Sequence, residues 1–192
     1  MANADKPRGL TPIRHLNGNP YNGAASLYHI DSAYATDLFI GDPVTYTGTA
    51  HTDGVPEVQA AGASGIPIGV IVGFEPTRTN LDLKYSPAST AQYVWVCDDP
   101  DVIFTIQDDG AATMTAAQIG LNVDCIAGAG DTTTGRSGYE IDSGGTTTPA
   151  TTATLMLRLL RVHQREDNEA FAANCEYEVL LNAHQNRSAT GV

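Results

Sequence analysis

From about residue 37 onward, the chain consists of short runs of Val, Ile, Tyr and Thr that alternate with turn-forming residues. β-Branched and aromatic residues favour extended strands, whereas the intervening Gly, Pro, Asp and Ser residues favour turns. The pattern predicts ten strands, over residues 38–40, 44–47, 55–59, 68–75, 93–98, 102–107, 121–126, 139–141, 154–161 and 175–183. Many short strands of this kind form a barrel or a sandwich. We therefore predict an all-β chain in which residues 37–192 form a compact β-barrel or sandwich knob.

Residues 1–36 differ from the rest of the chain, because they are rich in Pro and Gly and keep no helical or strand period for more than a few residues. The segment nevertheless carries more apolar and aromatic side chains than a disordered tail would. It is also locally basic, with Lys6, Arg8 and Arg14. These features predict an extended N-terminal arm whose side chains become buried against another surface; the alternative is an arm that packs on its own domain. The expected anchors are Leu10, Ile13, Arg14, Leu16, Tyr21, Leu27 and Tyr28.

Little helix is expected. One short helix is predicted over residues 113–120, where Thr113 can cap the first turn and Gly120 can end the last. Residues 165–173 could form a helical turn or a loop. Two low-complexity segments, 128–138 and 143–152, are rich in Gly and Thr and are expected to be exposed hairpin loops or linkers.

The charge balance narrows the possible partners. With 22 acidic and 10 basic residues, the formal net charge is −12. Nucleic acids and anionic membrane surfaces require clustered Lys and Arg, so the sequence predicts neither as a partner. Arg158, Arg161 and Arg165 nevertheless form a local positive patch around His163. This patch could meet an acidic surface on a partner or a neighbouring subunit, or it could pair internally with Asp and Glu.

No signature of catalysis or of a bound cofactor is present in the sequence. Cys97, Cys125 and Cys175 lie in apolar stretches without metal-ligand spacing and are expected to be buried free thiols. The runs 98–101 and 108–110 are dense in Asp but lack the spacing of a calcium loop, so they are interpreted as turns and not as metal sites. Neither a phosphate-binding loop nor a hydrolase nucleophile motif occurs. We therefore expect no enzyme, no cofactor and no metal.

The N-terminal residues lack the apolar stretch of a signal peptide, and no run is long enough to span a membrane, which predicts folding in a reducing cytoplasm.

Six short motifs occur along nearly the whole chain. They are residues 7–15 (PRGLTPIRH), 18–23 (GNPYNG), 39–44 (FIGDPV), 68–71 (IGVI), 135–137 (GRS) and 182–185 (NAHQ). In these motifs the sequence resembles the head decoration, or cement, proteins of tailed bacteriophages. None of the motifs is catalytic.

The resemblance implies a structural virion protein that is made in the cytoplasm of the host bacterium. It implies a β-rich knob, commonly a homotrimer, that sits on the outside of the expanded capsid and cements neighbouring major-capsid subunits. The N-terminal arm would then bind the capsid, and the arginine patch would be an interface. Two alternatives stay open: another virion component, such as a head fibre base or a tail protein, and a carbohydrate-binding module in which Trp95 and tyrosines line a sugar site.

Overall fold

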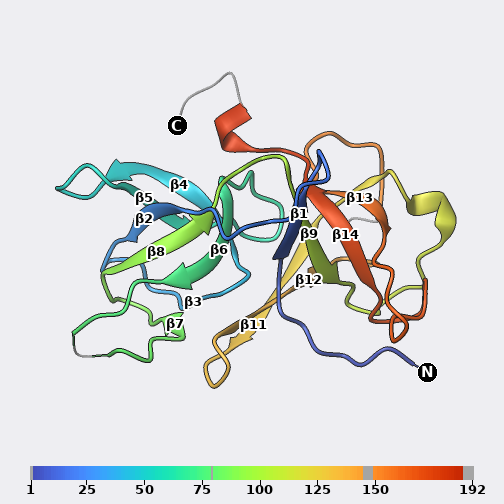
Figure 1. Ribbon diagram of the computed structural model, residues 1–192, viewed down its shortest axis with the longest axis horizontal. Helices are drawn as coiled ribbons and strands as arrows, with labels where there is room; N and C mark the ends of the chain where they lie inside the picture. The colour runs from blue at the N-terminus through green and yellow to red at the C-terminus, as the bar shows by residue number, and fades with distance from the viewer. Residues whose placement is uncertain (1, 79, 145–148, 188–192) are drawn as a thin grey trace.

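The structure is a computed structural model that describes residues 2–78, 80–144 and 149–187 (Figure 1). Strands dominate these residues, and their only helical elements are two 3-10 turns, η1 (Ala116–Gln118) and η2 (Gln185–Arg187). The strands are β1 (Thr11–His15), β2 (Ser26–Ile30), β3 (Leu38–Phe39), β4 (Pro43–Ala50), β5 (Pro56–Ala60), β6 (Gly69–Phe74), β7 (Tyr85–Ser86), β8 (Gln92–Cys97), β9 (Val102–Gln107), β10 (Asn122–Val123), β11 (Cys125–Asp131), β12 (Arg136–Ile141), β13 (Leu157–Val162) and β14 (Glu176–Leu181). The prediction of an all-β fold is confirmed.

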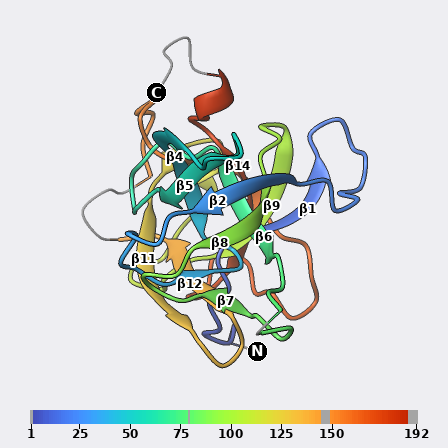
Figure 2. The ribbon, with the colours of Figure 1, turned by 90° about the vertical axis from the view of Figure 1, so that its left-hand side faces the viewer.

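Five strands close into a barrel in the order β2-β5-β4-β6-β8. Figure 1 shows this barrel on the left, and Figure 2 views the molecule from that side. Alternate residues of the strands point inward, and their apolar side chains fill the barrel, among them Val44, Val58 and Val94. Strand β2 pairs with β8 over five residues but meets β5 in parallel through one registered pair, His29 and Glu57. This single pair closes the barrel.

The second half of the fold is a five-stranded antiparallel sheet in the order β1-β9-β14-β13-β10. Phe104, Tyr177 and Leu159 lie on its inner face and are almost completely buried. The same core contains Val70 and Cys97 from the barrel strands β6 and β8. The barrel and the sheet therefore share apolar contacts.

The strands β11 and β12 extend further than predicted, because residues 128–138 were expected to be an exposed hairpin loop or a linker. Strand β11 instead continues to Asp131, and β12 begins at Arg136, so that four residues make the turn. Figure 1 shows this hairpin at the lower edge of the view, and backbone hydrogen bonds join Gly135 and Ser137 of the hairpin to Ile40, which follows β3. Gly128 and Gly138 face each other across it, and their lack of side chains made a paired segment look like a linker. Of the other low-complexity segment, residues 145–148 lie outside the described residues, and Ala150 bridges to Asn122.

The N-terminal segment is not a free arm. Strand β1 forms the edge of the five-stranded sheet through its pairing with β9, and β2 is a wall of the barrel. An extended segment beside a sheet satisfies its backbone N–H and C=O groups by joining that sheet. The edge position also accommodates Pro12, which has no N–H to donate. The boundary predicted at residue 36 therefore does not separate an arm from a knob, because the barrel includes residues from both sides of it.

The FIGDPV block forms a close backbone crossing. The amide of Leu10 donates a hydrogen bond to the carbonyl of Gly41 at 3.0 Å. Both glycines at the crossing, Gly9 and Gly41, have positive φ, +67° and +101°. A Cβ atom on Gly41 would lie 2.4 Å from the carbonyl oxygen of Arg8. Only glycine fits this conformation at this approach distance, so the crossing fixes the N-terminal segment to the start of the barrel.

The helix predicted over residues 113–120 is a single 3-10 turn, η1. It begins after Thr115, whose amide donates to the side chain of Gln118 at 2.6 Å. Ile119 is already extended, and the amide of Gly120 donates to the carbonyl of Leu159 in β13. The hydrogen bonds to the sheet end the helix after one turn.

Candidate functional site

The outer face of the five-stranded sheet carries a charged cluster. Side chains alternate along β14, so that Glu178 points away from the core that buries its neighbours. The Glu178 carboxylate accepts hydrogen bonds from Arg14 of β1 at 2.7 Å and from Arg161 of β13 at 2.8 Å, and it lies 3.3 Å from Nδ1 of His163. Burial acts to raise the pKa of Glu178, but the bonds from Arg161, Arg14 and His163 outweigh it and hold the pKa below its usual value.

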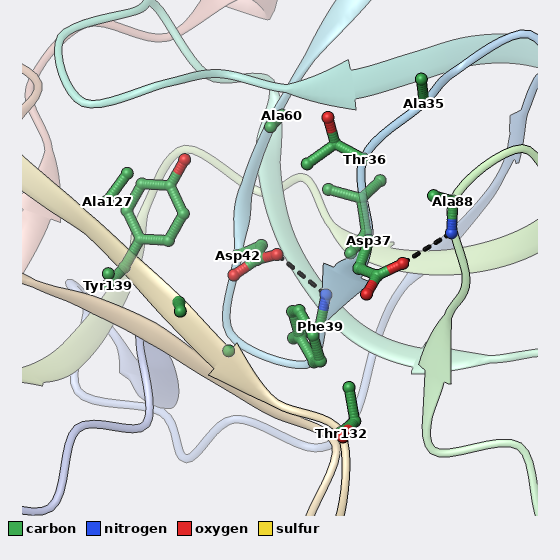
Figure 3. Close-up of a pocket in the computed structure, with 14 residues that line it drawn as sticks. Ala35, Thr36, Asp37, Phe39, Asp42, Ala60, Ala88, Ala127, Thr132 and Tyr139 are labelled. Atoms are coloured by element: carbon green, nitrogen blue, oxygen red, sulfur yellow. Dashed lines mark hydrogen bonds between the residues drawn. The ribbon is translucent and has the colours of Figure 1, made fainter.

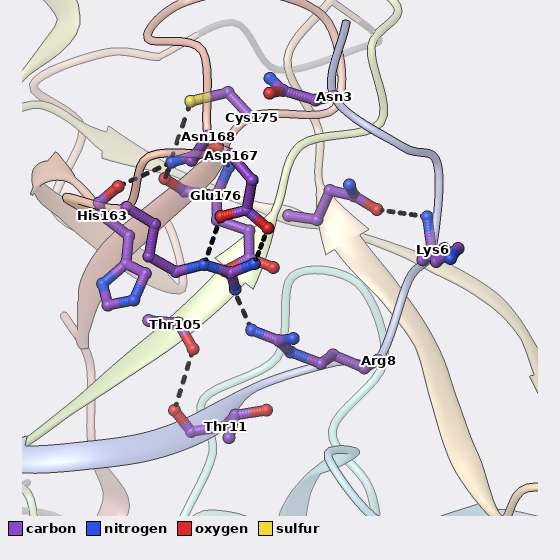
Figure 4. A network of polar contacts seen from close by, with 12 residues as sticks. Asn3, Lys6, Arg8, Thr11, Thr105, His163, Asp167, Asn168, Cys175 and Glu176 are labelled. Carbon is purple, nitrogen blue, oxygen red and sulfur yellow. Dashed lines mark hydrogen bonds and ion pairs between the residues drawn. The ribbon is translucent and has the colours of Figure 1, made fainter. Parts of the chain in front are cut away.

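A second carboxylate, Glu176, continues this cluster toward the N-terminus. It accepts hydrogen bonds from Arg8 at 2.9 Å and from Arg165 at 3.2 Å. Arg165 also pairs with Asp167, and this contact lowers the pKa of the Asp167 carboxyl. Figure 4 shows Arg8, Asp167 and Glu176 of this network. The network therefore connects the segment after β13, strand β14 and the first residues of the chain.

Residues 2–8 lie across the end of the sheet through polar contacts. The side chain of Asn3 donates to the carbonyls of Glu169 and Ala173. Gln107 accepts from the amide of Lys6 at 2.9 Å and donates to the carbonyl of Ala4 at 2.7 Å (Figure 4). The first apolar side chain after this segment, Leu10, is buried in the core.

A groove of about 570 Å³ opens beside these residues, between β1, β9 and the start of β12. Ile40 stands 39% exposed at its edge and forms a parallel bridge to Arg136. Arg136 is exposed and has no ion pair among the described residues. Apolar and basic side chains thus face the same opening. The lining residues are Arg8, Thr11, Ile13, Ile40, Thr105, Thr134, Arg136 and His163.

Basic residues gather on this side of an acidic molecule. The chain has 10 Lys and Arg residues and a formal net charge of −12. Six of the ten belong to the groove, to the polar pocket beside it or to the Glu178 cluster: Lys6, Arg8, Arg14, Arg136, Arg161 and Arg165. We call the surface formed by these six residues, with Ile13, Ile40 and His163, the basic groove.

The predicted arm anchors lie in different environments in the structure. Leu10 and Tyr28 are 1% and 4% exposed and belong to the two cores, so they are structural residues and are not free to bind a capsid. Ile13 and Arg14 lie in the basic groove. Leu16 is 53% exposed in the turn after β1.

The other two predicted anchors, Tyr21 and Leu27, differ from each other. Tyr21 packs on the core and donates its hydroxyl to the carbonyl of Ala24. Leu27 lies on the outer wall of the barrel, in register with Trp95.

The predicted arginine patch is divided as well. Arg161 and Arg165 join the basic groove, where both are paired with carboxylates. Arg158 instead bonds the side-chain oxygens of Asn122 and Asn182 at the β10 edge of the sheet. The alternative of internal pairing thus holds for Arg161 and Arg165.

Sequence reasoning missed Ile40 and Arg136 as site residues. Their signal was an exposed Ile inside the FIGDPV motif and an Arg that follows a Gly-rich turn. The two residues belong to one site only because the β11–β12 hairpin brings Arg136 next to Ile40 in the fold.

A larger pocket, of about 620 Å³, lies between the turn before β4 and the β11–β12 hairpin (Figure 3). Small side chains line most of it, and Asp42 and Tyr139 stand on its walls. The carboxylate of Asp42 accepts a hydrogen bond from the amide of Phe39 at 2.8 Å. Burial raises the pKa of Asp42 to about 6, although the hydrogen bonds from Ser137 and Phe39 act in the opposite direction.

The aspartate-rich runs behave as turns. Asp99 accepts a hydrogen bond from the amide of Asp101, and Asp108 accepts from the amides of Gly110 and Asn174. Among the described residues, no group of three or more His, Cys, Asp or Glu side chains is arranged to hold a metal ion. The three cysteines are buried and free, as predicted.

In the part of the chain that the structure describes, no helix is long and apolar enough to cross a membrane. Comparisons with protein-family models, with curated proteins and with solved structures found no match to this chain. The fold and the site define an all-β protein with a basic surface groove.

Proposed function

We propose that this protein is a structural component of a tailed-bacteriophage virion. In this proposal it binds the outside of the expanded capsid and cements neighbouring major-capsid subunits, as a homotrimer assembled in the cytoplasm of the host bacterium. The resemblance of its short motifs to the decoration family supports the virion assignment. The observation that carries the binding role is the basic groove, which combines exposed Ile40 with Arg136, an arginine without an ion pair among the described residues, in a chain of net charge −12.

The groove suits an extended protein segment that is acidic and carries apolar side chains. Ile13 and Ile40 offer apolar contact, while Arg136 offers its charge to a carboxylate. A protein that binds the expanded shell and not its dissociated subunits stabilises the shell by mass action. Three such sites in one trimer would multiply weak contacts into high avidity.

The role of the groove in capsid binding is tested by a matched pair of charge reversals. Arg136→Glu changes the groove, whereas Arg78→Glu makes the same change in net charge on an exposed residue between β6 and β7. Both variants are incubated with expanded heads that lack the protein and are then sedimented with them. Arg136→Glu should bind the heads about tenfold more weakly or worse, because it replaces one favourable contact with a repulsion. Arg78→Glu should bind like the parent.

Equal binding by both variants would contradict the role of the groove in capsid recognition. Gold-labelled protein on tails and not on heads would instead favour the alternative of a tail component. A melting temperature measured for each variant shows that a loss of binding is not a loss of fold.

A further inference from the structure

The outer wall of the barrel carries exposed aromatic side chains away from the basic groove. Trp95, the one tryptophan of the chain, lies on β8 and is 40% exposed. Val94 and Val96 on either side of it are completely buried, so Trp95 points away from the barrel interior. Leu27 of β2 is its partner in the neighbouring strand and shares its face.

The opposite side of the indole is uncovered. Gly73 of β6 is the registered partner of Trp95 on the other neighbouring strand. A Cβ atom built on Gly73 would have no heavy atom within 4 Å. Strand β6 therefore places no side chain beside Trp95, and the space next to Gly73 is open.

The aromatic surface continues along the same face to Tyr93, two residues from Trp95 and about 7 Å away along the strand. The Tyr93 ring lies 5.1 Å from the ring of His29 and 5.8 Å from that of His51. Its hydroxyl bonds Nδ1 of His51 at 3.1 Å and the carboxylate of Asp53. These contacts fix the ring before any ligand arrives, which reduces the entropy lost on binding.

Beside Tyr93 lies a pocket of about 260 Å³ that offers polar groups. It is lined by His29, His51, Glu75, Pro76, Thr77, Ala91, Gln92 and Tyr93. Within the described residues, the hydrogen bonds of His51 all use Nδ1, which leaves Nε2 of this half-exposed ring available to a ligand hydroxyl, whereas His29 is 4% exposed and packs against His51. The nearby carboxylates Asp53, Glu57 and Glu75 disfavour an anionic ligand.

We propose that this wall of the barrel binds a neutral oligosaccharide whose pyranose rings present a flat C–H face, as those of β-linked glucose and N-acetylglucosamine do. The flat C–H face of one pyranose ring would lie on the Trp95 indole, and the hydroxyls of an adjacent ring would bond the polar groups at Tyr93 and His51. An aromatic platform beside a few fixed polar groups is the usual composition of such sites. This site is separate from the basic groove and does not depend on capsid binding.

Trp95 makes the test direct, because all tryptophan fluorescence of the protein comes from the proposed site. Cellohexaose and chitohexaose are titrated into the full-length protein. The proposal predicts a saturable change in emission with at least one of them, with half-saturation at about 1 mM or below. No saturable change with either sugar up to about 10 mM would overturn it.

Two variants locate the site. Gly73→Leu fills the space beside the indole while keeping Trp95, and the backbone of Gly73 does not have the positive φ that would oppose a side chain. It should weaken binding about tenfold or more. Leu81→Ala removes an apolar side chain that is 80% exposed in another loop and should bind like the parent. Unchanged sugar binding by Gly73→Leu, with an unchanged melting temperature, would rule out this surface.

Discussion

Leu10 and Leu16 lie in the same N-terminal segment but have opposite environments, so the same substitution distinguishes an integrated segment from a free arm. Leu10 is 1% exposed and packs in the core of the sheet, whereas Leu16 is 53% exposed in a turn. Truncation of a buried leucine to alanine costs about 2–5 kcal/mol, from lost apolar burial and from the cavity that remains. An exposed leucine changes stability by about 0.5 kcal/mol or less.

For a chain of this length, 1 kcal/mol corresponds to a shift of about 2–4 °C in melting temperature. Leu10→Ala should therefore lower the melting temperature by about 4–20 °C, and Leu16→Ala by about 2 °C at most. Calorimetry gives both values, and urea denaturation checks that the slope of unfolding free energy against denaturant is unchanged. Similar small effects for the two variants would refute the placement of Leu10 in the core and would favour an arm that is held only by a partner.

Three further outcomes follow from the fold. Because the folded pKa of Asp42 is raised from 3.8 to about 6, its contribution to stability is complete at low pH and is lost as the pH rises through about 6. The parent should gain about 1–2 kcal/mol in unfolding free energy from pH 8 to pH 5 relative to Asp42→Asn, as measured by urea denaturation; parallel pH profiles would contradict the buried carboxyl. Gly41→Ala should lower the melting temperature far more than Gly48→Ala, because both have positive φ but only Gly41 has a backbone oxygen 2.4 Å from the new Cβ, and equal shifts would disprove the crossing. A thiol reagent should label none of the three cysteines in the native protein and all of them in denaturant; fast labelling of the native protein would show that a thiol is accessible.

The strands of the knob were predictable because their signal is local. Residues 102–107 were predicted as one strand, and β9 occupies the same residues, since five apolar or β-branched side chains end at an Asp-rich turn. The barrel strand β6 was found in the same way, with boundaries one residue inside the predicted ones. The low content of helix was predicted from the same pattern of short strands and turns, and the one helix expected, over residues 113–120, is a single 3-10 turn.

The N-terminal strands could not be read from local sequence. All five residues of β1 are half-buried, so burial does not alternate along this strand as it does along a strand with one buried face. Its partner β9 lies about 90 residues away in the sequence, and β2 closes the barrel by a parallel contact with one registered pair. Such pairings depend on the completed fold and not on the composition of either strand.

The site was predictable only in part, because it too depends on pairing between segments that are far apart in the sequence. Arg14 and Arg161 were singled out for their charge, but nothing in the sequence showed that Glu178 would join them from a third strand. Ile40 and Arg136 are brought together by the pairing of distant segments. The sequence thus shows which residues are charged or apolar, but which of them lie close together depends on the pairing of the strands.

Mass photometry of the protein alone and after incubation with expanded, protein-depleted heads tests the proposed function most directly. The account predicts a trimer in solution and saturation of the heads at a fixed number of copies per particle. A monomer that leaves the mass of the heads unchanged would contradict it.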